Sequence, residues 1–233
     1  MENNNLFLNA SCRALIIGSS GAIGGALVDN LKKIVGTKNV VTLSRTENGL
    51  DFMKPETISV CSRQQDGLFN LIVDATGSLS IDNVGPEKSL SMVEYETMLA
   101  QFKVNTIGPA LLIKNFMKFL PRKGKVVFAT LSARVGSIED NRLGGWISYR
   151  ASKAGLNQII KTASIEASRK NPHSVFLAIH PGTVLSKLTE PYLGNKSFVV
   201  PDEAAKNILR VIEQIDHSDT GGFFSFDGSK VPY

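Results

Sequence analysis

The sequence has few of the features that mark metal-binding, disulfide-rich or exported proteins. Only two of its 233 residues are cysteines, Cys12 and Cys61, and they form neither a disulfide framework nor a metal-ligand pattern. We therefore expect no metal site. The first ten residues are rich in asparagine and lack both the basic segment and the long apolar core of an export signal. A reducing, cytoplasmic location is the expectation that fits both observations.

Long apolar runs and runs of like charge are also missing. No stretch approaches the roughly 20 apolar residues that a membrane-spanning helix needs. The formal net charge is +5, and the charged residues, 20% of the chain, form no block of one sign. The sequence therefore predicts no binding to nucleic acid or to a membrane. The small positive excess either has no specific use or attracts an anionic cofactor.

Short apolar runs alternate with helical patterns along the chain. The expected strands cover residues 13–17, 40–44, 68–74, 126–131, 174–179 and 222–226. The expected helices cover residues 22–35, 91–120, 148–169 and 201–215. This alternation implies right-handed crossovers and an α/β fold whose mostly parallel sheet is covered by helices on both faces. Two spans, 48–66 and 185–200, have no clear period.

A glycine-rich turn follows the first expected strand and opens the first expected helix. Glycine allows a tight turn and a close approach to a pyrophosphate, and the helix N-terminus offers free N–H groups to the anion. The alternative is a glycine turn without a ligand, but the position in the first strand–helix unit favours a phosphate site. The residues that we expect at the cofactor are Gly18, Ser19, Ser20, Gly21, Ile23 and Gly24.

The second expected strand ends in Ser44 and Arg45. Dinucleotide sites usually hold an acidic residue here, which bonds the ribose hydroxyls of adenosine. This chain has no carboxylate at that point, and the Arg45 guanidinium suits a 2′-phosphate instead. The pattern favours NADP(H) over NAD(H). An exposed arginine at a strand end is the competing interpretation.

Tyr149 and Lys153 stand four residues apart at the start of an expected helix, so both side chains lie on one helical face. A phenol has a pKa of about 10 in water and is a poor proton donor at neutral pH. A cation one turn away favours the phenolate and should lower the pKa of Tyr149, which makes it a usable general acid or base. Alone, this spacing is common and usually marks a surface pair.

The glycine turn upstream and the Tyr149/Lys153 pair resemble the short-chain dehydrogenase/reductase family. The resemblance extends from Arg13 to residues 226–228 and implies a single-domain NAD(P)-binding Rossmann fold over residues 1–233. It also implies a doubly wound sheet of about seven strands and a short substrate lid near 185–200. Family members associate, so we expect a homodimer or homotetramer formed through helices 91–120 and 148–169. The middle glycine is placed as in the family's extended members.

The resemblance assigns further residues to the cofactor and the reaction. Asn105 matches the helix asparagine that holds a water beside the catalytic lysine. Asp74 to Gly77 corresponds to the family's Asn-Asn-Ala-Gly stretch, with both asparagines replaced, and Asp51 matches an aspartate against the adenine. After the expected strand 174–179, the chain continues with the segment that lines the nicotinamide in the family. The remaining expected cofactor contacts are Ala75, Thr76, Gly77, Pro181, Gly182, Val184 and Ser186.

The family also has a serine just after its fifth strand, often as the second member of a Ser-Ser pair. Alignment on Gly136 places Ala133 at the second serine and Ser132 at the first. A longer loop before Tyr149 would allow Ser132 to serve, and Ser137 is the reserve candidate. The role implied is a hydroxyl that donates a hydrogen bond to the substrate carbonyl as negative charge develops.

Residues 132–146 and 223–228 look most like the C-factor and sniffer-type carbonyl reductases. The function implied is reversible hydride transfer between NADP(H) and a small carbonyl or alcohol substrate, with Tyr149 as general acid and base. Lys153 would also hold the nicotinamide ribose. A second reading is a C-factor-like signalling or sensor protein with little turnover. A weaker third interpretation is a nucleotide-sugar enzyme of the extended type. The middle glycine suggests it, but we expect no large C-terminal substrate domain in this sequence.

Overall fold

Six parallel strands form one central sheet in the order β2-β1-β3-β4-β5-β6, as seen in the computed structural model, which describes residues 6–186, 189–192 and 198–233. The strands are β1 (Ala14–Ile17), β2 (Val40–Leu43), β3 (Leu71–Asp74), β4 (Val126–Leu131), β5 (Ser174–His180) and β6 (Gly222–Ser225). The helices are α1 (Ala22–Val35), α2 (Arg45–Asn48), α3 (Glu56–Arg63), α4 (Tyr95–Phe102), α5 (Gly108–Phe116), α6 (Ile147–Lys170) and α7 (Pro201–Gln214).

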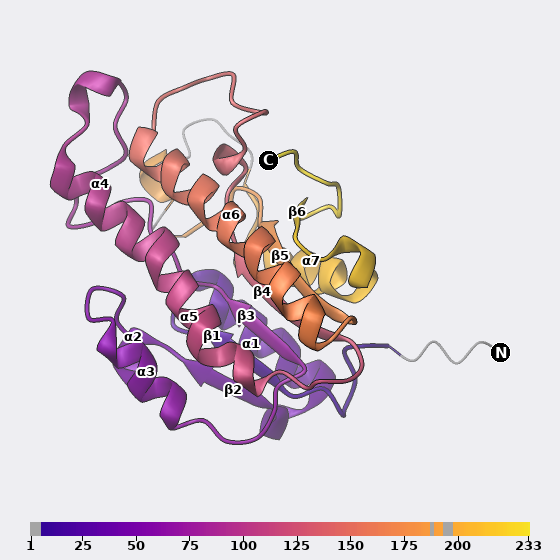
Figure 1. The fold of residues 1–233 in the computed structure, drawn as a ribbon. Helices are drawn as coiled ribbons and strands as arrows, with labels where there is room; N and C mark the ends of the chain where they lie inside the picture. Colours follow the sequence, from indigo (N-terminus) through magenta and orange to yellow (C-terminus); the bar gives the residue numbers. More distant parts are fainter. Residues whose placement is uncertain (1–5, 187–188, 193–197) are drawn as a thin grey trace.

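Helices cover both faces of this sheet, and α5 and α6 cross in front of it in Figure 1. Alternate residues of the buried strand β4 explain the two layers. Val127 and Ala129 pack in one core cluster with α1 and α7, whereas Val126 and Phe128 pack in the other with α5 and α6. Because a parallel strand between two helical layers is buried on both faces, its sequence is a continuous apolar run. The predicted doubly wound α/β fold is confirmed.

The described residues contain six strands, whereas about seven were expected. The span 48–66, which had no clear period, forms the end of α2, the helix α3 and turns rather than a strand. After β6 the chain turns at Gly228, and a single bridge between Phe224 and Lys230 follows it instead of a ladder. Neither segment therefore supplies a seventh strand to the sheet.

The expected helix over residues 91–120 is divided into shorter pieces. Between α4 and α5, residues Lys103–Ile107 form a π-helical turn. Pro109 lies four residues after Asn105, has no N–H, and so cannot donate the α-helical hydrogen bond to the Asn105 carbonyl. The ladder is widened at this point, and π-helical turns of this kind are frequent at functional sites.

The order of the strands reverses between the neighbouring parallel strands β1 and β3: the strand that follows β1, β2, lies on one side of them, and the strand that follows β3, β4, lies on the other. In open parallel sheets, ligands bind outside the carboxyl ends of the strands at such a reversal. Gly18 and Ala75 follow β1 and β3 directly, so the fold places both at this point.

Candidate active site

The glycine turn between β1 and α1 is shaped by two close backbone approaches. Gly18 has φ +87°, and its N–H donates to the Leu43 carbonyl of β2 over 2.7 Å. A Cβ added at Gly24 would lie 2.1 Å from the Gly18 carbonyl oxygen. No side chain caps the N-terminus of α1 at Gly21. The turn therefore requires glycine and leaves the helix N–H groups available to an anion.

A cleft of about 540 Å³ opens over this turn at the carboxyl ends of β1, β2 and β3. It is lined by predicted cofactor residues from three separate segments. These are Gly18, Ser20, Gly21, Ser44, Arg45, Asp51, Ala75, Thr76 and Gly77. The cleft therefore brings together predicted residues from three strand ends.

Other predicted residues do not line this cleft. Ser19, Ile23 and Gly24 shape the turn behind it, and the segment from Pro181 to Ser186 lies after β5. Sequence reasoning missed several lining residues, namely Leu50, Phe52, Met53, Ser78, Ser80, Ile81, Asp82 and Val104. Leu50, Phe52 and Met53 lie beside Asp51, and Ser78 to Asp82 follow Gly77, so proximity to these two residues was the available signal. Val104 lies in the π-helical turn next to Asn105.

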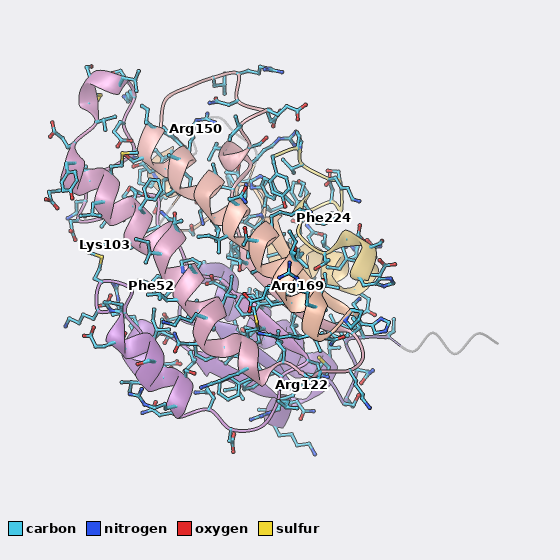
Figure 2. All side chains as sticks on the ribbon, viewed as in Figure 1. Phe52, Lys103, Arg122, Arg150, Arg169 and Phe224 are labelled. Atoms are coloured by element: carbon cyan, nitrogen blue, oxygen red, sulfur yellow. The ribbon has the colours of Figure 1, made fainter. Side chains whose placement is uncertain are left out.

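Phe52 shows how this part of the cleft wall is built. Its ring lies against the start of α5, where a Cβ at Gly108 would meet it at 2.4 Å (Figure 2). The Asp51 carboxylate accepts the Met53 N–H over 2.9 Å and fixes the turn. Glycine at 108 therefore lets the loop after β2 close onto the helix that carries Asn105.

Ser44 and Arg45 form the start of α2, a single helical turn after β2. The Ser44 hydroxyl caps this helix by accepting the Glu47 N–H over 3.2 Å. Arg45 is exposed, lines the cleft, and forms no ion pair with any residue that the structure describes. Its guanidinium is therefore available at the cleft edge.

Tyr149 lies in the first turn of α6 and Lys153 in the next, as the spacing predicted. The Lys153 ammonium donates to the Leu131 carbonyl of β4 over 3.0 Å and lies 6.0 Å from the centre of the Tyr149 ring. Burial raises the pKa of the Tyr149 phenol, and burial lowers the pKa of Lys153 to about 8 against the opposing charge of Asp74. The expected lowering of the Tyr149 pKa by the lysine is therefore not found in this structure, because desolvation dominates.

The start of α6 is held by a residue that sequence reasoning missed. The Glu87 carboxylate accepts both the N–H of Ser148, over 3.1 Å, and its hydroxyl proton. The Glu87 carbonyl accepts the N–H of Trp146, which adopts the left-handed conformation with φ 53°. Negative charge at a helix N-terminus is stabilising, so Glu87 fixes the turn that carries Tyr149. Nothing in its local sequence indicated this contact.

Asn105 is fully buried and connects the π-helical turn to the loop after β3. Its side-chain oxygen accepts the Ser78 N–H over 2.9 Å, and its amide donates to the Ser78 carbonyl over 2.8 Å. A Cβ at Gly77 would lie 3.1 Å from both the Asn105 oxygen and the Lys153 ammonium. Gly77 therefore lies both at the cleft and next to Lys153 of the Tyr149/Lys153 pair.

The two candidate serines are both buried after β4 but are bonded differently. The Ser132 hydroxyl donates to the Asn157 side chain on α6 over 2.7 Å. The Ser137 hydroxyl accepts the Asp140 N–H over 3.0 Å. Ser132 has already used its single proton, whereas that of Ser137 has no acceptor among the described residues.

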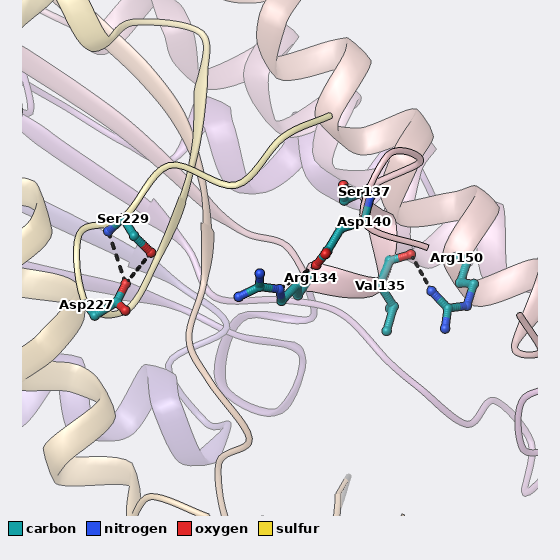
Figure 3. Close-up of polar contacts among 7 residues, drawn as sticks. All are labelled: Arg134, Val135, Ser137, Asp140, Arg150, Asp227 and Ser229. Carbon is teal, nitrogen blue, oxygen red and sulfur yellow. Dashed lines mark hydrogen bonds and ion pairs between the residues drawn. The ribbon is translucent and has the colours of Figure 1, made fainter. Parts of the chain in front are cut away.

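Arg150 of α6 holds the loop from 133 to 146 against this helix, and an ion pair stabilises the loop itself (Figure 3). Arg150, next to Tyr149, donates to the carbonyls of Val135 and Gly145 over 3.3 and 2.9 Å. Arg134 forms an ion pair with Asp140 over 2.6 Å. These contacts hold the serine loop beside the first turn of the helix.

Aromatic side chains border Tyr149. Trp146 stacks edge-on against Tyr149 at 6.3 Å and against Tyr192 at 5.6 Å between ring centres. The Tyr192 hydroxyl is hydrogen-bonded to Ser80 over 2.8 Å. Leu143, three residues before Trp146, is 91% exposed. Trp146 therefore packs between Tyr149 and Tyr192, and Leu143 faces solvent.

The segment after β5 begins with Pro181 and a positive-φ Gly182 packed against Phe226. Val184 is buried, pairs with Val199, and its carbonyl accepts the Thr189 hydroxyl. The Ser186 hydroxyl lies 3.1 Å from that of Thr189. The expected lid, residues 185–200, includes positions 187–188 and 193–197, which lie outside the described residues.

A parallel doubly wound sheet with a glycine turn at its reversal point defines a Rossmann-type fold. Residues 13–196 match the short chain dehydrogenase family, and the chain belongs to this family. Over 186 residues it is 30% identical to 1-hydroxy-2-glutathionyl-2-methyl-3-butene dehydrogenase of Rhodococcus sp. (strain AD45), covering 78% of each chain. It is 30% identical over 145 residues to C-signal of Myxococcus xanthus, covering 62% of this chain and 84% of that one.

Solved structures show the same fold. NADPH-bound carbonyl reductase from chicken fatty liver superposes with a TM-score of 0.79 at 22% identity, over 95% of this chain and 98% of that one. Carbonyl reductase Sniffer of D. melanogaster gives 0.77 at 18% identity, over 95% and 99%. The predicted family, with its resemblance to C-factor and sniffer-type proteins, is confirmed. No helix in the described part of the chain is both long and apolar enough to cross a membrane.

Proposed function

We propose that this protein is an NADP(H)-dependent oxidoreductase that interconverts a small carbonyl compound and its alcohol. One observation carries the proposal: Gly77 lines the cleft over the glycine turn and also lies next to the Lys153 ammonium. A Cβ at Gly77 would lie 3.1 Å from the Lys153 ammonium. The cleft and the Tyr149/Lys153 pair are thus two halves of one continuous site, which suits a long dinucleotide.

The residues present fit such a cofactor. The uncapped N-terminus of α1 and the backbone of Gly18 would hold the pyrophosphate, because any side chain there would fill the space. Asp51 and Arg45 would hold the adenosine end, and Pro181 to Ser186 the other end. When bound, the nicotinamide supplies or accepts the hydride.

The protein itself moves the proton. Burial raises the pKa of the Tyr149 phenol, so it is protonated at neutral pH, but it donates this proton readily only when a nearby cation stabilises the phenolate, which is the role that we assign to Lys153. Tyr149 gives this proton to the substrate oxygen as carbonyl reduction proceeds, and takes it back in the reverse direction. Lys153 supports the charge left on the phenol, and Asn105 would link Lys153 to solvent through a water.

Arg45 tests the cofactor preference. Arg45→Asp is expected to raise the KM for NADPH at least tenfold while that for NADH changes little or falls, since the variant loses a partner for the 2′-phosphate. Steady-state kinetics with both cofactors measure this effect. Lys54→Asp, a charge change of the same size in the segment between α2 and α3, serves as the control. Equal changes for NADPH and NADH in Arg45→Asp would contradict the assignment.

The serine pair tests how the substrate carbonyl is held. We retain Ser132 as the proposed donor, with Ser137 as the reserve. Loss of an oxyanion donor lowers kcat by roughly 10²–10³-fold. Whichever variant, Ser132→Ala or Ser137→Ala, shows this loss with an unchanged KM for NADPH identifies the donor. A small effect of Ser132→Ala together with a lower melting temperature would mean that its bond to Asn157 is structural.

A cofactor-binding sensor with little turnover is the second candidate. Two observations favour it: Ala133 stands at the family's second serine, and Ser132 donates its proton to Asn157. The 30% identity to C-signal of Myxococcus xanthus is compatible with a signalling role. NADPH binding without turnover of any compound in a broad panel of aldehydes and ketones would select this candidate.

The remaining assignments complete the proposal. Residues 1–233 form one cofactor-binding domain, with 185–200 as the substrate lid, in a cytoplasmic homodimer or homotetramer. The surface between α5 and α6 supports association, since it holds a groove lined by Ile113, Met117 and Ala163. Neither nucleic acid nor a membrane is an expected partner.

A further inference from the structure

Asp74 is a buried carboxylate at the carboxyl end of β3, and one of its oxygens has no partner. Its Oδ1 accepts the N–H of Thr76 over 3.0 Å and also the Thr76 hydroxyl proton. Its Oδ2 is buried and has no hydrogen-bond partner among the described residues. Leaving a buried acceptor unpaired costs free energy, and a nearby positive charge would reduce this cost.

Lys153, on α6, lies near this carboxylate, which stands at the end of β3. Asp74 pairs in register with Thr130 of β4, whose hydroxyl is also buried without a partner. Lys153 donates to the carbonyl of Leu131, the next residue on β4. Ile72 and Phe128, two residues before Asp74 and Thr130, pack in the core cluster that contains α6 residues, so the carboxylate and the ammonium lie on the same buried face between β3, β4 and α6, without a direct ion pair among the described residues.

The charges in this compartment act on each other. Burial raises the pKa of Asp74, and the Lys153 charge opposes this rise. Burial lowers the pKa of Lys153 to about 8, and the Asp74 charge opposes this fall. The other groups facing the pair are neutral: Thr76 after β3, Thr130 on β4 and the Tyr149 phenol on α6. No other charged side chain of the described residues contributes to either pKa.

We propose that Asp74 is the counter-charge of Lys153, a positioning residue that keeps the buried ammonium protonated beneath Tyr149. This inference rests on the proposed function, in which the Lys153 charge supports proton transfer by Tyr149. An asparagine, which the family resemblance places at this position, would fill the same volume but carry no charge. Without Asp74, desolvation acts on Lys153 alone and removes its proton at a lower pH.

Titration of Lys153 tests the proposal without cofactor or substrate. In protein with ¹³C-labelled lysine side chains, the Lys153 resonance, identified by its loss in Lys153→Met, is expected to titrate near pH 8. In Asp74→Asn its pKa should fall by about 1 unit, the smaller end of the usual effect of a nearby opposite charge. Thr130→Val, which alters the same compartment without changing a charge, should leave it in place. An unchanged Lys153 pKa in Asp74→Asn overturns the proposal.

If Asp74→Asn does not fold, titration of Asp74 in Lys153→Met still tests the proposal. Coupling between two sites is equal in both directions, so Lys153→Met must raise the Asp74 pKa by the shift that Asp74 imposes on Lys153. Carboxyl ¹³C titration of labelled aspartate measures it, and no rise would also overturn the proposal. In Asp74→Asn the alkaline limb of the kcat–pH profile for carbonyl reduction should move to lower pH by a similar shift. Coupled titration in a wild-type protein that turns over no substrate would overturn the proposed function alone.

Discussion

Replacing Tyr149 with phenylalanine is expected to lower kcat for NADPH-dependent carbonyl reduction by roughly 10²–10⁴-fold, the usual contribution of a general acid. The substitution removes one oxygen from a partly buried side chain and leaves the ring that packs against Trp146. NADPH oxidation with a panel of aldehydes and ketones measures the loss. Binding of NADPH, followed by fluorescence, should remain within a few-fold of the wild-type value.

Tyr95→Phe is the matched control for this variant. Tyr95 begins α4 and is 74% exposed, so the same atomic change there should leave kcat unaltered. Substantial turnover in Tyr149→Phe, equal to that of Tyr95→Phe, would show that another group delivers the proton. A wild-type protein that binds NADPH but oxidises none of it would instead support the sensor.

Replacing Gly24 with alanine should weaken NADPH binding at least tenfold, or about 1.4 kcal/mol. The new Cβ would lie 2.1 Å from the Gly18 carbonyl oxygen and 2.8 Å from its carbon. Gly18 cannot move away easily. Its N–H is bonded to the Leu43 carbonyl over 2.7 Å, and a Cβ added at Gly18 would lie only 3.0 Å from the Ala75 backbone, which shows how little space is left around it. Overpacking of this kind typically costs 1–3 kcal/mol, so a lower melting temperature should accompany the loss of affinity.

Gly25→Ala provides the comparison one residue further along α1. There a Cβ would lie 3.4 Å from the Ser19 carbonyl, which is ordinary contact. Because alanine favours a helix over glycine by about 1 kcal/mol, this variant should keep its affinity and melt at the same or a higher temperature. If Gly24→Ala bound NADPH as tightly as Gly25→Ala, the assignment of this turn to the pyrophosphate would be wrong.

Patterns that depend on local geometry were predictable from the sequence. The four-residue spacing of Tyr149 and Lys153 requires only a helix, and α6 begins two residues before Tyr149 as expected. The uniform apolar run of β4 requires only burial on both faces. The glycine turn also follows from local sequence, because the backbone itself excludes a Cβ at Gly24.

Contacts between distant segments were not predictable in the same way. Ser132 was chosen by its place after β4, but the hydroxyl is bonded to Asn157, 25 residues away. Glu87 contacts Ser148 across 61 residues, and no local signal marks it. Pro109 was the one local indication of the π-helical turn at Asn105. The helical pattern over 91–120 continues across this position, so a single long helix was predicted.

The sequence by itself determined the α/β class, the glycine turn between β1 and α1, and the placement of Tyr149 and Lys153 one helical turn apart. Each of these depends on residues near one another in the chain, where helix and strand periods set the geometry. Only the tertiary structure decided the electrostatic state of that pair. Burial raises the Tyr149 pKa, and Asp74 is brought to Lys153 by strand order rather than by spacing. Desolvation and long-range charge depend on what packs around a group, and this appears only when the chain is folded.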